Sequence, residues 1–464
     1  MARPAASSPA RAPVPVARGY GRGAAVLSAG IGATGLVTYG YFAIASHSLS
    51  ESAYGGITLL WSALFITVSV LYRPVEQLLS RTVADRAARG QEGSEHLRVA
   101  ATIQLALGFA FVVAALALRG PIRDGLFDGS ATLYWVLIVA VLAYAASYFA
   151  RGFLAGSHRF GLYGGLVLME AGSRCLFAVA VAVGIASGQS VVALGMAAAP
   201  IVSLAVVPWT IRRRLPPAPP RDPEVERSAA DALDDASAGS PGAEPQFTLT
   251  HGSGFAAAVL LVMLAEQTFL NAGPLLVKAT EGDSGSALAG YTFNVLLIAR
   301  APLQLFQSVQ TAILPHLTRL RASGEPDPFR RSVNVTLAAI AAFATLVALV
   351  MLAAGPAVMD LVFGGGFDYD RVGLVLISLG MGLYLCAATL NQALLAQARA
   401  REAAACWLVS AGAFVAFLLA ARFEDRVLQV EAGYRGGAVL LSALLYGLYR
   451  RGEAPARAPR SAPR

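Results

Sequence analysis

Charged residues are scarce in this sequence, and lysine is almost missing from it. Only 14% of the 464 residues are charged and 56% are hydrophobic, which gives a mean hydropathy of +0.59. Lys278 is the only lysine, so the other 35 of the 36 lysine and arginine residues are arginine. Soluble proteins of this length contain fewer hydrophobic and more charged residues. The composition therefore predicts a membrane protein.

The sequence is also poor in the residues that build metal sites, disulfides and nucleotide sites. The three cysteines lie in apolar runs, and the five histidines are scattered without the spacing of metal ligands. No glycine-rich phosphate loop follows a predicted strand. The Asp-Tyr-Asp sequence at 368–370 resembles the metal site of sugar-nucleotide glycosyltransferases, but it lies in a short external loop with no soluble domain around it. We therefore expect no enzyme, no cofactor and no metal.

What the sequence does contain is a series of long apolar runs. The hydrocarbon core of a bilayer is about 30 Å thick, so a helix needs about 20 apolar residues to cross it. The runs that we assign as crossings are residues 23–46, 54–79, 99–118, 131–150, 161–186, 190–210, 253–278, 287–313, 333–354, 372–395, 404–421 and 434–449. They predict an all-α polytopic membrane protein with twelve transmembrane helices.

The positions of the basic residues predict the orientation of these helices. With the N-terminus in the cytoplasm, 27 of the 36 basic residues fall in cytoplasmic segments and 7 in external segments. Membrane proteins show this excess of arginine and lysine on the cytoplasmic side. Both termini are therefore expected in the cytoplasm, which agrees with an even number of spans. The same pattern accounts for the net charge of +8 without nucleic acid as a partner.

Composition also divides the chain into two membrane halves. We expect disordered cytoplasmic tails at 1–22 and 451–464, and a disordered cytoplasmic linker at 212–250, which is rich in proline, serine and acidic residues. The segments 23–211 and 251–450 are then two six-helix bundles.

The two bundles are expected to be repeats of one another. Arg73-Pro74 in the second span corresponds to Arg300-Ala301-Pro302 in the eighth, and both lie toward the cytoplasmic part of the span. Six spans per half give the repeats the same orientation, so the pseudo-two-fold axis that relates them runs along the membrane normal.

Four charged residues lie deep in the predicted spans: Glu170, Arg174, Glu266 and Arg300. An ionisable group there costs about 3 kcal/mol or more and normally faces a partner or a cavity. Glu170 and Arg174 are four residues apart and can pair on one helix face. This pair either orients the fifth span or serves ion and substrate binding. Glu266 is either a site for a coupling proton or sodium ion, or the partner of Arg300 on the next span.

Two arginines belong to stripes of polar residues. Arg300 shares one helix face with Gln304 and Gln307, and Arg73 shares one with Gln77. A guanidinium stays charged at any accessible pH and binds phosphate oxygens through a bidentate fork. We interpret the stripes as the walls of a water-filled cleft that binds an anion; the alternative is that they join packed helices.

Several stretches resemble the multidrug/oligosaccharidyl-lipid/polysaccharide exporter superfamily, specifically its polysaccharide-biosynthesis flippase branch. They are EQTFLNAGP (266–274), AGY (289–291), RAPLQLFQ (300–307), LP (314–315), RGFLAGSHRF (151–160) and LNQALLA (390–396). The resemblance implies a V-shaped pair of six-helix bundles with alternating access and a cavity lined by the first, second, seventh and eighth spans. The first span departs from the pattern, because it lacks the charges of lipid II flippases and the aspartate of many multidrug exporters.

The resemblance implies that a polyprenyl-diphosphate-linked oligosaccharide is flipped from the cytoplasmic to the outer leaflet of a bacterial plasma membrane. Expected substrate contacts are Arg73, Gln77, Arg174, Asn271, Arg300, Gln304 and Gln307, and expected coupling-ion sites are Glu170 and Glu266. Expected partners are this glycan lipid, membrane lipid, a coupling proton or sodium ion, and the glycosyltransferases and polymerase of glycan assembly. Two alternatives stay open: a cation-coupled exporter of amphipathic drugs, and a membrane scaffold of a glycan assembly complex that transports nothing.

Overall fold

The structure is a computed structural model, and every regular element in the part that it describes is a helix. The described residues are 17–88, 94–206, 249–282, 285–298, 300, 326–364, 366, 369–397, 399–421 and 423–453. The linker expected at 212–250 and most of both expected tails lie outside these residues, although the first helix begins at Ala17, inside the expected N-terminal tail.

The first half consists of six long helices joined by short connections. They are α1 (Ala17–Ser48), α2 (Glu51–Ala88), α3 (Glu95–Ala117), α4 (Ala131–Gly156), α5 (Phe160–Ala182) and α6 (Gln189–Ser203), with short helical segments η1 (Pro121–Leu126) and η2 (Leu204–Val206). Apolar sequences form helices in a membrane because a helix satisfies all its internal backbone hydrogen bonds. Local signals set the ends: the Ser130 hydroxyl accepts a hydrogen bond from the Leu133 amide at 3.3 Å and caps α4.

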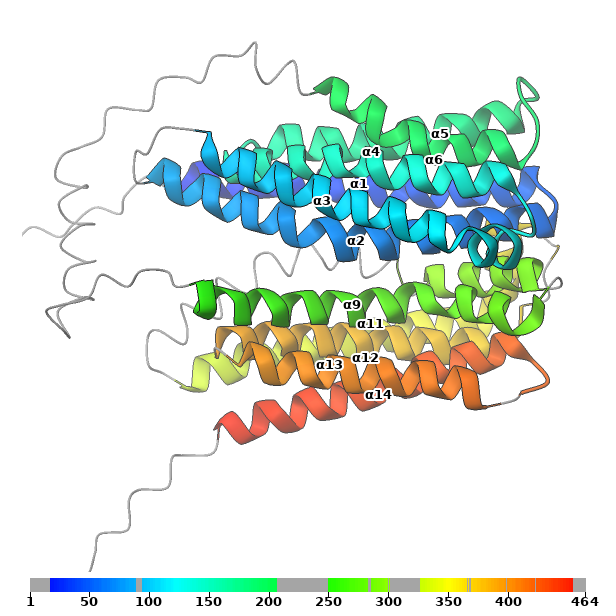
Figure 1. The fold of residues 1–464 in the computed structure, drawn as a ribbon. Coiled ribbons are helices and arrows are strands. Elements are labelled where there is room, and N and C mark those ends of the chain that lie inside the picture. The colour runs from blue at the N-terminus through cyan, green and yellow to red at the C-terminus, as the bar shows by residue number, and fades with distance from the viewer. Residues whose placement is uncertain are drawn as a thin grey trace, which may run out of the picture.

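The second half repeats this construction. Its described helices are α9 (Leu249–Glu281), the helix Gly285–Ile298, α11 (Pro326–Phe363), α12 (Arg371–Ala396), α13 (Ala400–Ala420) and α14 (Arg426–Glu453). Asp370 caps α12 by accepting a hydrogen bond from the Gly373 amide at 3.0 Å. In Figure 1 the first half (blue to green) lies above the second (green to red), and the helices of both run in nearly the same direction.

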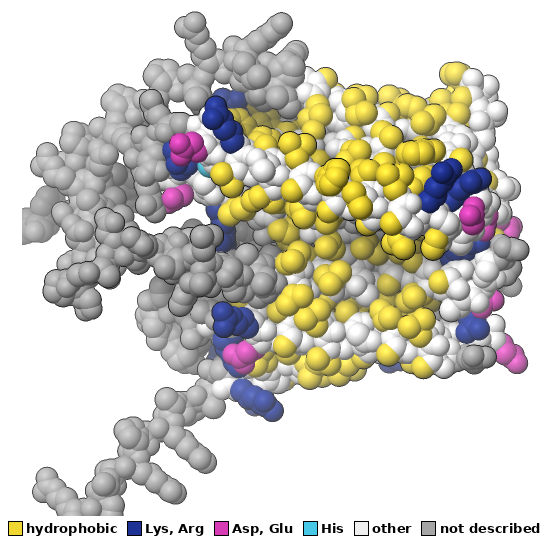
Figure 2. Space-filling model, viewed as in Figure 1, with side chains coloured by type: hydrophobic (Ala, Val, Ile, Leu, Met, Phe, Trp, Pro, Cys, Tyr) yellow, Lys and Arg dark blue, Asp and Glu magenta, His cyan; other side chains and the backbone are white. Residues whose placement is uncertain are grey.

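The helices form a multi-pass membrane protein. Eight of the described helices are long and apolar enough to cross a bilayer, whereas α6 and Gly285–Ile298 are shorter apolar helices. Figure 2 shows apolar side chains across the middle of the molecule and charged side chains gathered at its two ends. Every predicted span coincides at least in part with a helix, but the count of twelve crossings stays a prediction.

The same pairs of helices pack together in each half. Counting helices within a half, the first packs against the fifth, the third against the fourth, the fourth against the sixth, and the fifth against the sixth. In the first half these pairs are α1–α5, α3–α4, α4–α6 and α5–α6; in the second they are α9–α13, α11–α12, α12–α14 and α13–α14. Common packing is what two repeats of one bundle require.

The two halves meet along a surface that we call the seam, formed mainly by α1 and α2 of the first half and by α9 and Gly285–Ile298 of the second. We call the end of the helices where α2 finishes and α9 begins the linker end, at the left of Figure 1. The opposite end, where α1 turns into α2, is called the far end. These are the four segments that the resemblance implies as the lining of a transport cavity.

Candidate functional site

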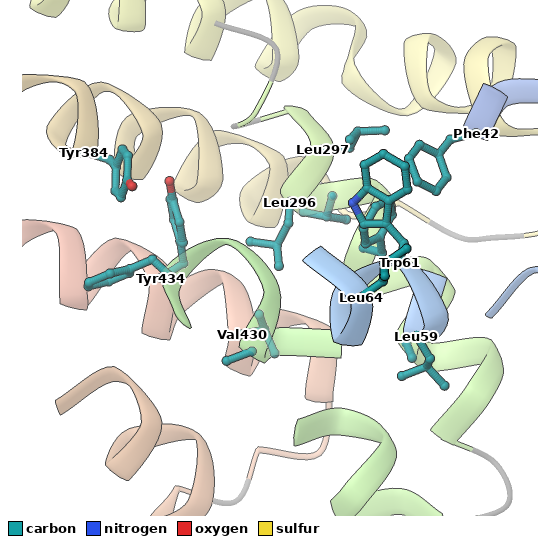
Figure 3. Packing of buried hydrophobic residues seen from close by; sticks show 14 of the residues in the cluster. Phe42, Leu59, Trp61, Leu64, Leu296, Leu297, Tyr384, Val430 and Tyr434 are labelled. Atoms are coloured by element: carbon teal, nitrogen blue, oxygen red, sulfur yellow. The ribbon is translucent and has the colours of Figure 1, made fainter. Parts of the chain in front are cut away.

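Aromatic and aliphatic side chains fill the far part of the seam. Phe42 of α1 lies 4.6 Å from Phe293 and 4.9 Å from Trp61 of α2, measured between ring centroids. Figure 3 shows Phe42 and Trp61 close to Leu296 and Leu297 of the opposite half. All five are buried. Apolar packing therefore joins the halves in this region, together with a hydrogen bond from the Tyr39 hydroxyl to the Leu297 carbonyl.

Arg300 is anchored inside the second half. Its Nη2 donates a hydrogen bond to the Asn271 side-chain oxygen at 2.8 Å and another to the Leu270 carbonyl. The guanidinium carbon lies 4.6 Å from the centroid of the Phe293 ring, a cation–π distance. Arg300 is 8% exposed, and its Nε has no hydrogen-bond partner. Among the described residues, its anchors are thus an amide and a carbonyl, and Glu266 is not its partner.

Asn271 connects Arg300 to the rest of α9. Its amide nitrogen donates to the Gln267 side-chain oxygen at 3.0 Å, while its oxygen accepts from Arg300. Asn271 and Gln267 are both buried. The amide orientation is therefore fixed from both sides, so Arg300 has one defined position.

Arg73 of α2 differs from Arg300 because it has no hydrogen bond and no ion pair within 4.0 Å among the described residues. It is half-buried, and the carboxylates that attract it electrostatically are Glu266 of α9 and Glu76 of its own helix. The Tyr163 hydroxyl already donates to Glu76 at 2.9 Å. Glu266 is likewise half-buried and unpaired within the described part of the chain. The electrostatic partner of Glu266 is therefore Arg73, across the seam.

Gln77 lies one turn beyond Arg73 toward the linker end of α2 and is exposed. Gln304 and Gln307, the other amides expected at the site, lie outside the described residues. Their contribution to a polar cleft stays a prediction.

Arg174 and Glu170 lie inside the first half and not at the seam. Glu170 accepts a hydrogen bond from Arg151 of α4 at 2.6 Å and from Ser147 at 3.2 Å, and it lies 3.8 Å from Arg174. The i,i+4 pairing expected from the sequence is present, but the closer partner is Arg151. The Glu170 and Arg174 side chains are each 4% exposed, so their proposed roles in ion and substrate binding stay predictions.

An aromatic surface surrounds Arg174. Its guanidinium carbon lies 4.6 Å from the Trp61 ring and 5.6 Å from the Phe65 ring, both in α2. Its Nε and Nη1 are buried without a hydrogen-bond partner. The negative faces of the rings compensate the positive charge, which explains how this arginine shares one carboxylate with Arg151.

Hydrogen bonds between the halves gather at the far end. Tyr54 of α2 donates to Asn294, whose amide donates to Tyr369 at 3.1 Å. Lys278 donates to Asp128, and Ser286 donates to the other oxygen of Asp128 at 2.6 Å. These contacts join segments that are 75 to 240 residues apart in the sequence.

A cavity of about 660 Å³ lies beside these contacts. It is lined by Ser46, His47, Ser50 and Tyr54 near the α1–α2 junction, and by Ala287, Phe363 and Gly364 of the second half. Within the described residues, no group of three or more His, Cys, Asp or Glu side chains could hold a metal ion.

Sequence reasoning missed the partners of several charged residues. The sequence pattern pairs none of Arg151, Tyr163, Asp128 and Lys278 with a charged residue. No local signal identifies such pairs, because each joins different helices. The one usable hint was a lysine at the end of an apolar run in a chain that otherwise contains only arginine.

Comparison with known proteins agrees with this architecture. No protein-family model and no curated protein sequence matches the chain. Solved structures do match: one described as the inward-facing conformation of a multidrug resistance MATE family transporter of the MOP superfamily has a TM-score of 0.67 at 13% identity, covering 93% of this chain and 100% of that one.

Two further matches are the eukaryotic MATE transporter AtDTX14, with a TM-score of 0.60 at 15% identity over 92% of this chain and 95% of that one, and a mutant of the Vibrio cholerae MATE transporter VcmN, with a TM-score of 0.56 at 14% identity over 94% and 98%. The expectation that the chain is not an enzyme agrees with this likeness, since these proteins are described as transporters. The chain therefore has the fold of these membrane transporters.

Proposed function

We propose that this protein transports an amphipathic molecule with an anionic head by alternating access, and that the cargo is a polyprenyl-diphosphate-linked oligosaccharide. The single observation that carries the proposal is Arg73, a half-buried guanidinium at the seam with no hydrogen bond to any described residue. Glu266 and Glu76 attract its charge, but among the described residues no acceptor replaces the hydrogen bonds that water would give it. A diphosphate provides such an acceptor, because its oxygens accept the paired N–H groups of a guanidinium.

Arg300 supplies the matching group from the second half. It occupies the position that corresponds to Arg73 in the repeat, and Asn271 holds it at 2.8 Å. Its Nε is buried without a partner, so a ligand could bind this N–H only after the halves move apart. In the proposed complex, Arg73 and Arg300 bind the diphosphate from opposite halves, Gln77, Gln304 and Gln307 bind sugar or phosphate, and the lipid tail stays in the bilayer.

Glu266 is proposed as the coupling group. In the empty site it is the carboxylate of the opposite half that attracts Arg73. A diphosphate at Arg73 would repel the Glu266 carboxylate, which favours proton or sodium binding to it. Cargo binding and ion binding are thereby linked through one pair of residues. Glycosyltransferases and a polymerase on the cytoplasmic and outer sides, respectively, are the proposed suppliers and consumers of the cargo.

The experiment uses purified protein in liposomes and measures flipping of a fluorescent polyprenyl-diphosphate oligosaccharide. Arg73→Ala is expected to lower the flipping rate by at least about tenfold, because one hydrogen bond between charged groups accounts for that factor. Arg73→Lys keeps the charge but loses the paired N–H groups of the guanidinium. Its flipping rate is therefore expected between those of Arg73→Ala and the unchanged protein. Arg401→Ala removes an exposed arginine of α13 and serves as the control.

Equal flipping by Arg73→Ala and the unchanged protein would contradict the proposal. Arg73 is a better target than Arg300, because Arg300 also holds α9 in place through Asn271 and its removal would disturb the fold.

A second candidate function is the export of amphipathic cations. It is favoured by the unpaired, half-buried Glu266 at the seam, and the first of the similar structures is described as a multidrug resistance transporter. Under this function, Glu266→Gln abolishes efflux of a cationic dye from the same liposomes, and Arg73→Ala leaves that efflux intact. A scaffold without transport would show neither activity.

A further inference from the structure

The far end of the seam contains an ionic contact between the halves that the binding site does not use. Asp128 follows η1 in the first half, and its two carboxylate oxygens are both occupied by the second half: Oδ1 by Lys278 of α9 and Oδ2 by Ser286 of the helix Gly285–Ile298, at 2.6 Å. We call these three residues the far-end clamp. One side chain thus holds two helices of the opposite half.

The backbone of Asp128 is shaped for this contact. Its φ is +48° and that of Gly129 is +77°, so both residues lie in the left-handed region, which costs energy for a residue with a Cβ. Aspartate tolerates this conformation better than most residues, and the glycine completes the turn. The turn directs the Asp128 carboxylate across the seam toward Lys278 of α9.

The second half surrounds the Lys278 side chain, and the ammonium group contacts Asp128 of the first half. Its side chain is 1% exposed, and the ammonium also donates to the Gly282 carbonyl at 2.7 Å. A Cβ on Gly285 would lie 2.9 Å from the Lys278 Cα, so α9 and the next helix are in direct contact there. The Asp128 side chain is 40% exposed. The clamp therefore joins a buried cation to an anion that water can reach.

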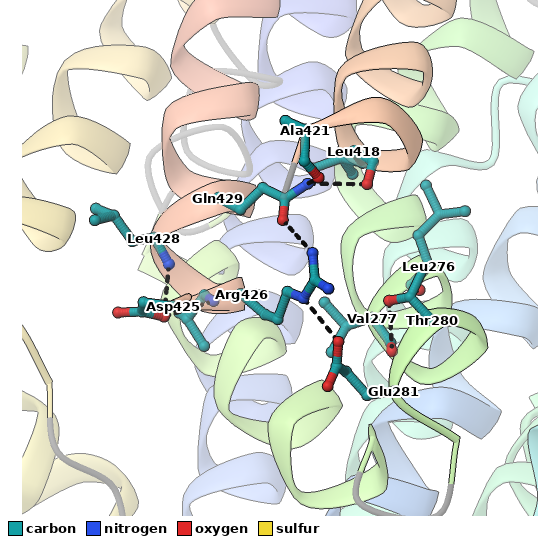
Figure 4. A network of polar contacts seen from close by, with 11 residues as sticks. Leu276, Val277, Thr280, Glu281, Leu418, Ala421, Asp425, Arg426, Leu428 and Gln429 are labelled. Atoms are coloured by element: carbon teal, nitrogen blue, oxygen red, sulfur yellow. Dashed lines mark hydrogen bonds and ion pairs between the residues drawn. The ribbon is translucent and has the colours of Figure 1, made fainter. Parts of the chain in front are cut away.

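The second half is rigid around Lys278. Figure 4 shows Arg426, at the start of α14, bonded to Glu281 of α9 and to Gln429; the distances are 2.7 Å and 2.9 Å. Gln429 in turn donates to the carbonyls of Leu418 and Ala421 in and after α13. The ends of α9, α13 and α14 form one unit, so movement at the far end separates this unit from Asp128.

Next to the far-end clamp, near Tyr54, the backbones of α2 and the helix Gly285–Ile298 pack closely together. A Cβ on Gly55 of α2 would collide with the Ser286 carbonyl oxygen, so the two helices touch there without side chains between them. The 660 Å³ cavity has Tyr54 and Ala287 in its lining, next to this contact.

We propose that the far-end clamp is the outer gate: Asp128 holds Lys278 and Ser286 while the far end of the seam is closed, and it must release them in each transport cycle. The gate rests on the proposed alternating access, but not on the identity of the cargo. A buried ammonium with its carboxylate is stable, and once water enters, an exposed pair contributes little. The contact therefore has two states: closed, with the Lys278 ammonium buried against Asp128, or open, with the ammonium in water.

The experiment uses Lys278 as its own reporter, because it is the only lysine in the chain. An impermeant N-hydroxysuccinimide ester added to the outer side of liposomes acylates an amine only after it leaves its carboxylate. The unchanged protein is expected to react slowly. Asp128→Asn is expected to react at least about tenfold faster, because it removes a hydrogen bond between charged groups from the closed state.

Three variants make the result specific. Lys278→Arg keeps the charge but has no side-chain amine, so it gives the background of the terminal amine. Ser286→Ala keeps the charge partner and removes one bond, so an intermediate rate is expected; an unfolded protein would not give such a graded series. Asp124→Asn changes a neighbouring aspartate that is 66% exposed and should react like the unchanged protein.

Equal labelling of Lys278 in Asp128→Asn and the unchanged protein would overturn the gate. So would full cargo transport by Asp128→Asn with labelling that stays slow throughout. Either result leaves the flipping rates of the Arg73 variants untouched, so failure of the gate and failure of the proposed function are distinguishable.

Discussion

At the scale of single residues, this protein places charge inside the membrane in two different ways. Arg151, Glu170 and Arg174 satisfy one another within the first half, with aromatic rings of α2 compensating the remaining positive charge. Arg73 and Glu266 have no such contacts among the described residues and attract one another electrostatically across the seam. The first group pairs within one bundle, while the second is the proposed site for a ligand.

Glu170→Gln tests the first of these two roles. The change leaves two buried arginines without their carboxylate, and removing one partner of a buried ion pair costs about 3–5 kcal/mol. The free energy of unfolding in detergent micelles, measured with a chemical denaturant, should fall by about that amount. Glu402→Gln is the matched control, because it also ends a glutamate–arginine pair, with Arg399, but at the surface. If both variants unfold at the same denaturant concentration, the buried group does not stabilise the first half.

At the scale of helices, glycine positions determine how closely two helices approach. Gly152 and Gly156 of α4 face α2: a Cβ on Gly152 would lie 2.8 Å from the Glu76 carbonyl oxygen, and one on Gly156 would lie 2.6 Å from that of Ser80. Small residues four apart allow such packing in membranes. The contact lies just after Arg73 in α2. Packing against α4 therefore helps to position Arg73 in the proposed binding site.

Gly152→Ala is expected to push α4 away from α2. Inserting a methyl group into a packed contact costs about 1–3 kcal/mol, so the free energy of unfolding should fall by that amount, and flipping should weaken with it. Gly436→Ala in α14 is the control, because nothing lies within 4 Å of its added Cβ; its stability should be unchanged or higher by up to about 1 kcal/mol. Similar losses in both variants would show that the close α2–α4 contact is not required.

The sequence predicted helices more successfully than their partners. Long apolar runs gave the position of each span, because helix formation in a membrane depends on local composition and length. The i,i+4 spacing gave the Glu170–Arg174 pair, since both residues lie on one helix. It could not give Arg151 as the closer partner, nor Asn271 as the anchor of Arg300, because these contacts depend on how different helices are rotated and packed.

At the scale of the whole molecule, the two halves touch at the far end through Tyr54, Asp128 and their partners. One of the similar structures is described as inward-facing. If the far end faces outward, the contacts described here close the outer side of the seam. The arginine distribution predicts that orientation, so the whole transport cycle depends on it.

Two serine-to-cysteine changes test the orientation. Ser50, between α1 and α2, is exposed at the far end, and Ser94, before α3, is exposed at the linker end. In a background with Cys175, Cys386 and Cys406 changed to alanine, an impermeant maleimide applied to intact cells should label Ser50→Cys and not Ser94→Cys. After the membrane is made permeable, both should react, which shows that the second site is shielded by sidedness and not by folding. Labelling of Ser94→Cys alone in intact cells would reverse the orientation; the far-end clamp would then be an inner gate, and the proposed direction of flipping would be wrong.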